Sequence, residues 1–196
     1  VGSEMCIRDR EEAQKTIELF RPFLEDQNVL KIAHNLKYDY KVLKNYNIEV
    51  EGKLFDTMVA HYLLNPDGRH GMDYLSEMYL DYKPVSIESL IGKKGKNQRT
   101  LRDVDVQTQT DYAAEDADVT FQLYELFAPQ LAKENLEDLF YNVEMPLMKV
   151  LAKIELTGVK LDNNWLAQES KDLENDLKIL ELSLIHISEP TRLLSI

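Results

Sequence analysis

Apolar positions in the first part of the chain change from a helical spacing to short continuous runs. Between Glu11 and Asp26 they lie three and four residues apart among charged side chains, which predicts an amphipathic helix that Pro22 kinks or ends early. Residues 29–33, with the sequence VLKIA, predict a short strand. A helix capped by Asn35 follows, and residues 54–56 predict a second strand after a turn at Gly52.

The rest of the chain is rich in helical spacings. We expect helices at 57–64, 72–80 and 86–91, then a basic loop, and longer helices at 106–127, 134–156 and 162–182. The order strand, helix, strand, helix favours an α/β fold in which helices cover a sheet. The change to almost continuous helix predicts a domain boundary, with one domain at 11–132 and the start of another at 133–182.

The two ends of the chain lack these periodicities. Residues 1–10 and 183–196 follow neither a helical nor a strand pattern, and they resemble translated adaptor sequence. We interpret both segments as non-native flanks.

Composition excludes several classes of protein. Of the 196 residues, 44% are hydrophobic and 30% are charged, as in ordinary soluble globular proteins. No apolar run is long enough to cross a membrane, and no secretory signal is present, so we expect no membrane association. A single cysteine, Cys6, fits a reducing compartment and a cytoplasmic protein. The net charge of −12 excludes a broad cationic face, so any binding of DNA needs a local offset.

The predicted helix at 106–127 carries an acid within its apolar stripe. At about 100° per residue, Asp116 falls in line with Tyr112 and Val119. A carboxylate on the core-facing side is costly unless it is paired, hydrogen-bonded, bound to a metal or open to a cleft. Asp116 therefore requires a partner, and Tyr112 faces the same space one turn earlier. The other acids of this helix share a separate face that we expect to be solvated: Asp111, Glu115 and Asp118.

A second group of polar residues, Asn35 to Asp39, follows the VLKIA strand directly. Asp39 falls in the first turn of the next helix, at the sheet end where open α/β folds commonly bind ligands. Taken alone, Asp39 is better explained by the helix dipole and Asn35 by helix capping. Taken together, Asp39 and Asp116 are two carboxylates from different elements that could coordinate Mg²⁺ or Mn²⁺, which indicates phosphate chemistry.

Five ordered segments resemble family A DNA polymerases, the bacterial DNA polymerase I family. HNLKYD at 34–39 and YAAEDAD at 112–118 are similar to two motifs of its 3′-5′ proofreading exonuclease domain, which belongs to the DEDDy nucleases. FDTMVAHYLLNPDGRHGMDYLS and GKKGKNQRT lie between them in the same order. VEMPLMKVLAKIELTGVKLD, at 143–162, resembles the start of the polymerase domain. The resemblance covers nearly all of residues 11–182.

The resemblance implies a truncated ribonuclease H-like exonuclease fold, a mixed sheet with flanking helices, followed by helices of the polymerase domain. It implies that Asp39 and Asp116 bind metal, that Tyr112 orients the attacking water and that Asn35 helps to shape the site. The family's reaction uses two Mg²⁺ (or Mn²⁺) ions to hydrolyse the terminal phosphodiester at a single-stranded DNA 3′ end, releasing nucleoside monophosphates. We expect the parent enzyme to be monomeric.

The sequence departs from the family pattern in one respect. The family has a D-x-E pair on an early strand, upstream of the motif that contains Asp39. Two such strings occur here, at 9–11 and 172–174, and both are interpreted as coincidences because neither lies in a predicted strand. With two of the four metal carboxylates missing, we expect the fragment itself to be inactive and the parent to be active.

The loop GKKGKNQRTLR is the one locally basic segment of the sequence. Two interpretations of this loop have equal support, contact with DNA phosphates and a mobile loop in solvent. In the first interpretation, the substrate is bound by Asn35 together with Lys93, Lys94, Lys96 and Arg99. The cations are Lys93, Lys94, Lys96, Arg99 and Arg102. Asp56 could reach a metal, but a helix cap is the better interpretation. The four histidines show no paired ligand spacing, so none is assigned to a metal.

Two alternatives stay open. Ribonuclease D and helicase-linked DEDDy exonucleases share the motifs, although residues 143–162 argue against them. A degenerate exonuclease domain kept as a scaffold is the alternative outside the enzyme class. The presence of Asp39, Tyr112 and Asp116 favours an active parent.

Overall fold

The computed structural model describes residues 13–188 except residues 94, 96 and 97. The chain divides into two compact units, Val1–Thr157 and Gly158–Ile196. The predicted flank 1–10 and residues 189–196 of the other flank lie outside the described residues.

The predicted first helix is broken into two pieces. Residues 13–18 are helical, a turn follows, and α2 (Arg21–Leu24) begins with Pro22 in its first turn. Proline is tolerated there because its missing N–H would have no partner within the helix. The predicted effect of Pro22 is therefore confirmed. Arg21 then joins this segment to a later part of the chain, since its guanidinium donates a 2.9 Å hydrogen bond to the carbonyl of Asn47.

The strands form a parallel pair. β1 (Lys31–Ala33) pairs with β2 (Leu54–Asp56), and Ile32 lies opposite Phe55. Parallel neighbours need a crossover connection, and α3 (Leu36–Lys44) provides it. α4 (Thr57–Leu64) follows β2, so the predicted order of strand, helix, strand, helix is confirmed. In the described part of the chain the sheet consists of these two strands.

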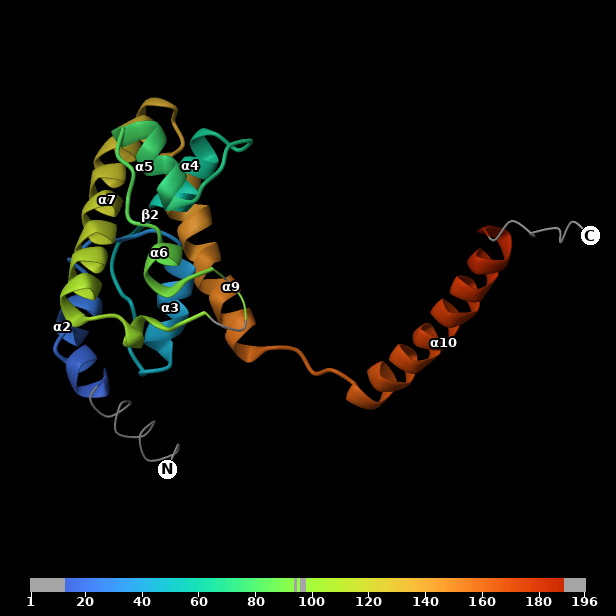
Figure 1. Ribbon diagram of the computed structural model, residues 1–196. Helices are drawn as coiled ribbons and strands as arrows, with labels where there is room; N and C mark the ends of the chain where they lie inside the picture. The colour runs from blue at the N-terminus through green and yellow to red at the C-terminus, as the bar shows by residue number, and fades with distance from the viewer. Residues whose placement is uncertain (1–12, 94, 96–97, 189–196) are drawn as a thin grey trace, which may run out of the picture. The chain divides into compact units, whose positions relative to one another are not determined.

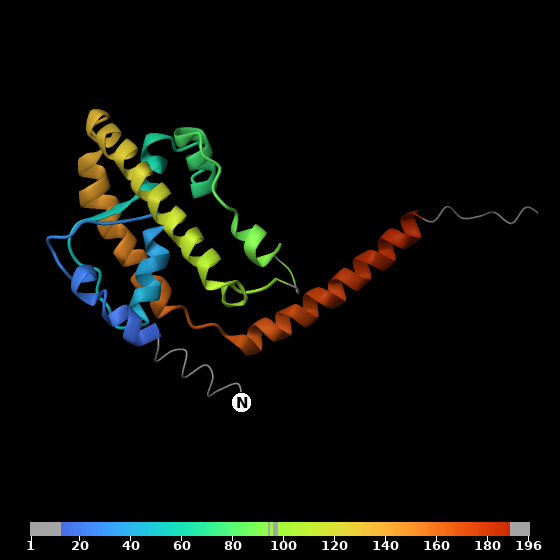
Figure 2. The same cartoon turned by 60° about the vertical axis from the view of Figure 1, so that its left-hand side comes forward.

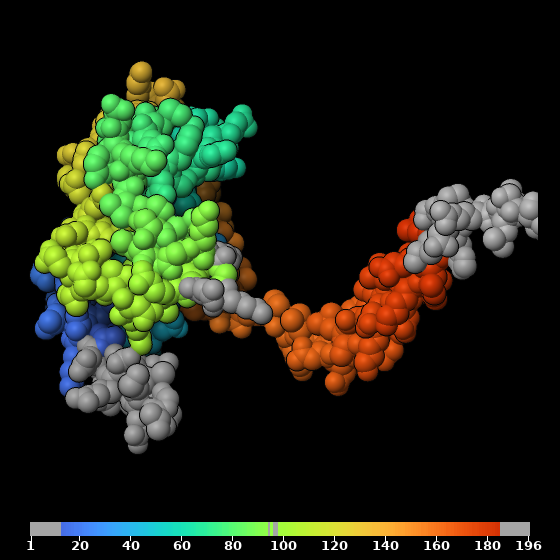
Figure 3. Space-filling model, viewed as in Figure 1, coloured from blue at the N-terminus to red at the C-terminus, as the bar shows by residue number. Residues whose placement is uncertain are grey.

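Three short elements and one long helix come next. α5 (Met72–Leu80), α6 (Ile87–Ile91) and the 3₁₀ turn η1 (Leu101–Asp103) lead to α7 (Val106–Lys133). In the space-filling view of Figure 3, α5 and α6 lie at the surface of the first unit. α7 continues past the predicted end at residue 127 and contains Pro129. Pro129 costs the helix one backbone hydrogen bond, but Phe127 and Leu131 on the opposite face are buried, and their packing offsets that cost.

The last elements of the first unit pack back onto the strands and α3. They are α8 (Glu137–Leu139), the π-helical turn η2 (Phe140–Glu144) and α9 (Met145–Thr157). α9 contacts both α3 and β2, and Glu155 forms ion pairs with Lys37 and Lys41 of α3 at 2.6 and 2.5 Å. The second unit contains α10 (Asn163–Ser188), whose described side chains are exposed. The domain boundary at 132/133 stays a prediction.

The core is built around β2. Phe55 is fully buried, and its ring centroid lies 4.8 Å from those of Tyr124 in α7 and Phe140 in η2. α7 also contacts β1. Figures 1 and 2 show α7, the long yellow helix, from two directions. The helices α7 and α9 thus enclose the strands, and the strand ends become fixed points from which polar side chains can be presented.

Candidate active site

Asp39 and Asp116 line the same pocket, of about 430 Å³. Asp39 comes from the first turn of α3, and Asp116 comes from the middle of α7. Ala33 and His34, at the carboxyl end of β1, form another part of the wall. The structure therefore brings together two acids separated by about half of the first unit's sequence. Asp39 is exposed to solvent, whereas Asp116 is half-buried.

Asp56 fixes the position of the helix that carries Asp39. The Asp56 side chain is only 2% exposed, and its oxygens accept hydrogen bonds from backbone N–H groups at the starts of two helices. The donors in α3 are Asn35 at 3.1 Å and Leu36 at 2.8 Å. The donors in α4 are Met58 at 2.9 Å and Val59 at 3.4 Å. The prediction that Asp56 caps a helix is confirmed, and it serves a second helix as well.

Asn35 has a different role from the predicted side-chain cap. It occupies the N-cap position of α3 in a left-handed conformation, with φ 63° and ψ 48°, but its side chain makes no capping hydrogen bond. Asparagine tolerates this conformation better than most residues. The predicted capping bond is wrong because the Asp56 carboxylate already accepts from the first N–H groups of α3.

Tyr112 accompanies Asp116 as the helical spacing predicts. Burial, together with the Asp116 charge and hydrogen bond, raises the pKa of Tyr112 to about 12. Burial also raises the pKa of Asp116, an effect that the Tyr112 bond opposes and the charges of Glu115 and Asp73 reinforce. The pKa of Asp39 is raised by desolvation and then by the charge of Asp56. Both pocket carboxylates are therefore short of compensating positive charge.

The predicted solvated face of α7 needs one correction. Glu115 accepts hydrogen bonds from the Tyr82 hydroxyl and, at 2.8 Å, from the backbone N–H of Val85. It therefore ties α7 to the segment after α5, while Asp111 and Asp118 are exposed as expected. Helical periodicity could not reveal this contact, because its partners are distant in sequence.

The basic segment is described only in part. Lys94 and Lys96 lie outside the described residues. The Lys93 side chain is exposed. The Arg99 guanidinium donates a 2.9 Å hydrogen bond to the carbonyl of Leu90, so this side chain folds back on α6. The predicted contacts of these residues with DNA stay predictions.

Sequence reasoning missed His34 and Thr120 as pocket residues. The Nδ1 atom of His34 lies 2.8 Å from the Thr57 hydroxyl, and its buried Nε2 atom has no hydrogen-bond partner within the described part of the chain. Two signals could have identified them. His34 directly follows β1, and Thr120 lies four residues after Asp116 on the same helix face.

His61 and His70 are in contact next to the core, although their spacing in the sequence is not typical of metal ligands. The Nδ1 atoms of His61 and His70 are 2.7 Å apart, and the Nε2 atom of His61 lies 3.0 Å from the Tyr79 hydroxyl. His61 is 1% exposed, and its pKa is lowered by burial and by the charges of His70 and His34. In the described residues, no group of three or more His, Cys, Asp or Glu side chains is placed to hold a metal ion.

We expect the free energy of unfolding to fall as the pH drops below about 6.5, the ordinary pKa of histidine. The unfolded chain protonates His61 at that value, whereas the folded chain does so at lower pH. The contribution of neutral His61 to the free energy of unfolding is therefore complete above about pH 6.5. It is lost as the pH falls toward the pKa that His61 has in the folded chain. Urea unfolding between pH 7.5 and 5 measures the slope of the free energy of unfolding against pH, and His61→Asn should reduce this slope. The pKa of His34 is lowered too and leaves a smaller slope of the same sign. Equal slopes in both proteins would contradict this explanation.

The structure describes one of the two D-x-E strings. The string at 9–11 is outside the described residues, and the string at 172–174 lies on exposed positions of α10. Because the second string is helical, the expectation that it does not lie in a strand is confirmed.

Two solved structures, one of NrnC and one of a polymerase domain, are similar to this chain in fold. Brucella melitensis NrnC with bound Mg²⁺ matches 69% of this chain and 62% of its own, with a TM-score of 0.55 and 21% identity. The POL domain of Pol1 from M. smegmatis, in complex with DNA primer-template and dNTP, matches 90% of this chain and 28% of its own, with a TM-score of 0.61 and 22% identity. The fold thus belongs to the class shared by these structures, an α/β domain followed by helices, which confirms the predicted fold class.

Comparison of sequences assigns the chain to one protein family within this fold class. DNA polymerase I of Rhizobium leguminosarum is 40% identical over 181 residues, which cover 88% of this chain and 18% of the relative. DNA polymerase I of Chloroflexus aurantiacus is 40% identical over 157 residues, or 79% of this chain and 16% of the relative. A family model described as 3′-5′ exonuclease, of the DNA polymerase A group, matches residues 2–132. The chain belongs to this exonuclease family, and the predicted family is confirmed.

The chain spans only 18% and 16% of the length of these two relatives. None of the helices in the described part of the chain is both long and apolar enough to span a membrane.

Proposed function

We propose that this domain acts as a proofreading 3′-5′ exonuclease within a DNA polymerase I, hydrolysing the terminal phosphodiester of a single-stranded DNA 3′ end. The observation that carries the proposal is the shared pocket of Asp39 and Asp116, with Tyr112 bonded to Asp116. Two carboxylates from separate elements, next to a phenol, suit metal-assisted attack on a phosphate.

The pocket donors fit a hard divalent cation. Carboxylate oxygens are the ligands that Mg²⁺ and Mn²⁺ prefer. Desolvation raises the pKa values of Asp39 and Asp116, so a cation that stabilises the ionised carboxylates would offset an existing cost. We propose that two such ions serve the complete site. Since the described residues provide no cluster of three ligands, further donors must complete it.

Each residue then has a distinct task in the proposed reaction. A metal pair bound there would supply Lewis-acid chemistry, which favours ionisation of water and stabilises negative charge on the leaving oxygen. Asp39 and Asp116 would hold the ions, and Tyr112 would orient the attacking water through its hydroxyl. Asn35, in its left-handed conformation at the start of α3, would shape the site beside the DNA terminus.

DNA is the proposed partner despite the net charge of −12. Metal ions in the pocket would neutralise the two carboxylates locally, and the basic segment would meet the DNA backbone. Its proposed contacts are Lys93, Lys94, Lys96 and Arg99. The parent enzyme is proposed to be monomeric and cytoplasmic.

The proposal is tested by DNA hydrolysis in two forms of the protein. We expect a chain extended upstream through a strand with a D-x-E pair to remove nucleoside monophosphates from a 5′-labelled single strand in Mg²⁺. The 196-residue chain should be slower by about a hundredfold or more, because it lacks ligands for the metal pair. Product length on a denaturing gel reports the rate.

Two controls decide between the proposal and the scaffold alternative. EDTA should stop the reaction, and a 3′-phosphorylated oligonucleotide run in parallel should show whether attack starts at the 3′ end. If the extended, folded protein released no nucleotide in Mg²⁺ or Mn²⁺, the scaffold alternative would replace the exonuclease.

A further inference from the structure

A second, larger pocket lies at the opposite end of the strands. It has a volume of about 650 Å³ and is lined by the residues that lead into β2 and by residues of η2 and α9. The candidate active site takes in the carboxyl end of β1, whereas this pocket takes in the amino end of β2, and the two share no lining residue. Its volume is in the range of small-molecule sites.

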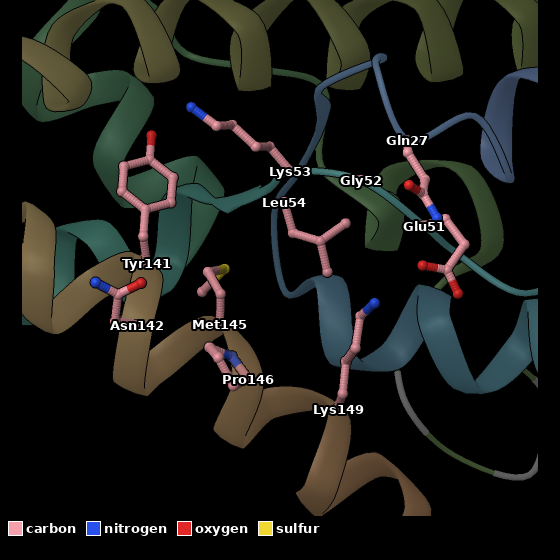
Figure 4. A pocket seen from close by; sticks show the side chains of 10 residues that line it. All are labelled: Gln27, Glu51, Gly52, Lys53, Leu54, Tyr141, Asn142, Met145, Pro146 and Lys149. Atoms are coloured by element: carbon pink, nitrogen blue, oxygen red, sulfur yellow. The ribbon is translucent and has the colours of Figure 1, made fainter.

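The pocket combines an apolar floor with an aromatic side wall. Leu54 and Met145 are each 4% exposed and lie at its centre in Figure 4. The Tyr141 ring stands beside them, half-buried, with its face and hydroxyl at the pocket wall. A flat apolar wall of this kind suits a planar aromatic group.

Ammonium groups stand next to this wall. The Lys53 Nζ atom lies 5.9 Å from the Tyr141 ring centroid, within the range of a cation–π contact. The Lys149 Nζ atom donates a 2.9 Å hydrogen bond to the Val50 carbonyl and has further N–H donors to offer. Glu51 is the single carboxylate in the lining. The pocket is therefore locally cationic in a protein whose net charge is −12.

The backbone departs from a regular α-helix where it forms this wall. Residues Phe140–Glu144 adopt a π-helical turn, and its members Tyr141 and Asn142 line the pocket. Single π-helical turns are rare and occur frequently at functional sites. The turn places the aromatic ring and an amide side by side, and Gln27 supplies a second amide across the pocket.

We propose that this pocket binds a nucleoside monophosphate. The base would stack on Tyr141 and be hydrogen-bonded at its edge by the amides of Asn142 and Gln27. The phosphate would meet the ammonium groups of Lys53 and Lys149. The ligand is of the same chemical class as the product of the proposed exonuclease, but the pocket is separate and needs no metal ion.

Calorimetric titration of the 196-residue chain with deoxyadenosine monophosphate in EDTA tests the proposal. The titration uses an Asp39→Ala/Asp116→Ala background, which removes the carboxylates of the candidate active site. We expect binding to persist there and deoxyadenosine, which lacks the phosphate, to bind roughly tenfold more weakly. Lys53→Gln should weaken binding by roughly fivefold.

Matched controls separate the pocket from general charge attraction. Lys133→Gln makes the same charge change at an exposed position outside the pocket and should leave binding unchanged. Tyr141→Leu should weaken binding by roughly tenfold, and circular dichroism shows whether this variant is folded. Lys53 is exposed, so its variant keeps the test decisive even if Tyr141→Leu unfolds.

Three results would overturn the proposal. The first is an absence of binding at millimolar nucleotide. The second is binding by the chain that keeps Asp39 and Asp116 together with no binding by the Asp39→Ala/Asp116→Ala variant. The third is equal weakening of binding by Lys53→Gln and Lys133→Gln. Because no DNA hydrolysis is measured, failure here leaves the proposed exonuclease standing, and failure of the exonuclease test leaves this pocket standing.

Discussion

Asp116→Asn is expected to lower the rate of DNA hydrolysis by the upstream-extended protein by about a thousandfold or more. The substitution keeps the side-chain shape and an oxygen that can accept the Tyr112 hydrogen bond, but it removes the negative charge that would hold a cation. The folded structure should lose little stability, because burial already raises the pKa of Asp116 and so disfavours its charged form. Single-strand hydrolysis in Mg²⁺ and thermal unfolding measure the two effects.

Asp118→Asn is the matched control for this prediction. Asp118 lies on the same helix with an exposed side chain and is not among the residues that line the Asp39 pocket. The same charge change there should leave the hydrolysis rate within about twofold, since surface substitutions away from a site have small effects. Full activity in Asp116→Asn, or equal losses in both variants, would remove Asp116 from the metal site.

Asp56→Ala is expected to lower the free energy of unfolding by about 4 kcal/mol. The carboxylate is almost fully buried and accepts from four backbone N–H groups, two in the first turn of α4 and two at the start of α3. Alanine would leave buried donors without acceptors, and each such group costs about 1–3 kcal/mol before the structure relaxes. Urea unfolding monitored by circular dichroism gives the value.

Two variants calibrate the effect of Asp56. Asp105→Ala removes an exposed cap that accepts from Thr108 at the start of α7, and it should lower the free energy of unfolding much less than Asp56→Ala does. Asp56→Asn keeps one acceptor oxygen and should fall between the two. If Asp56→Ala cost no more than Asp105→Ala, the double cap would not organise the start of α3. Because α3 carries Asp39, loss of this cap should also disturb the candidate active site.

The local elements around the candidate site were predictable because each has a local cause. The strand at 54–56 and the helices at 57–64 and 72–80 agree with β2, α4 and α5 to the residue. Their apolar spacing and turn residues act over only a few positions. The placement of Tyr112 one turn before Asp116 was predictable for the same reason, since a helix fixes both directions.

Other features depended on partners distant in sequence. Helical propensity ends α7 near Pro129, yet burial of Leu131 carries the helix to Lys133. The pairing of His61 with His70 bridges a loop whose path no spacing rule describes. The π-helical turn at Phe140–Glu144 begins with Phe140, whose ring packs on Phe55, a contact between segments far apart in the chain.

The sequence by itself determined the order of strands and helices, the alignment of Tyr112 with Asp116 and the family motifs, because these depend on neighbours within a few turns. Only the tertiary structure decided that Asp39 and Asp116 line one pocket, that Asp56 rather than Asn35 satisfies the start of α3, and that a cationic pocket forms at the other end of β2. Each of these depends on which distant segments pack together, and burial of the shared apolar core selects that packing.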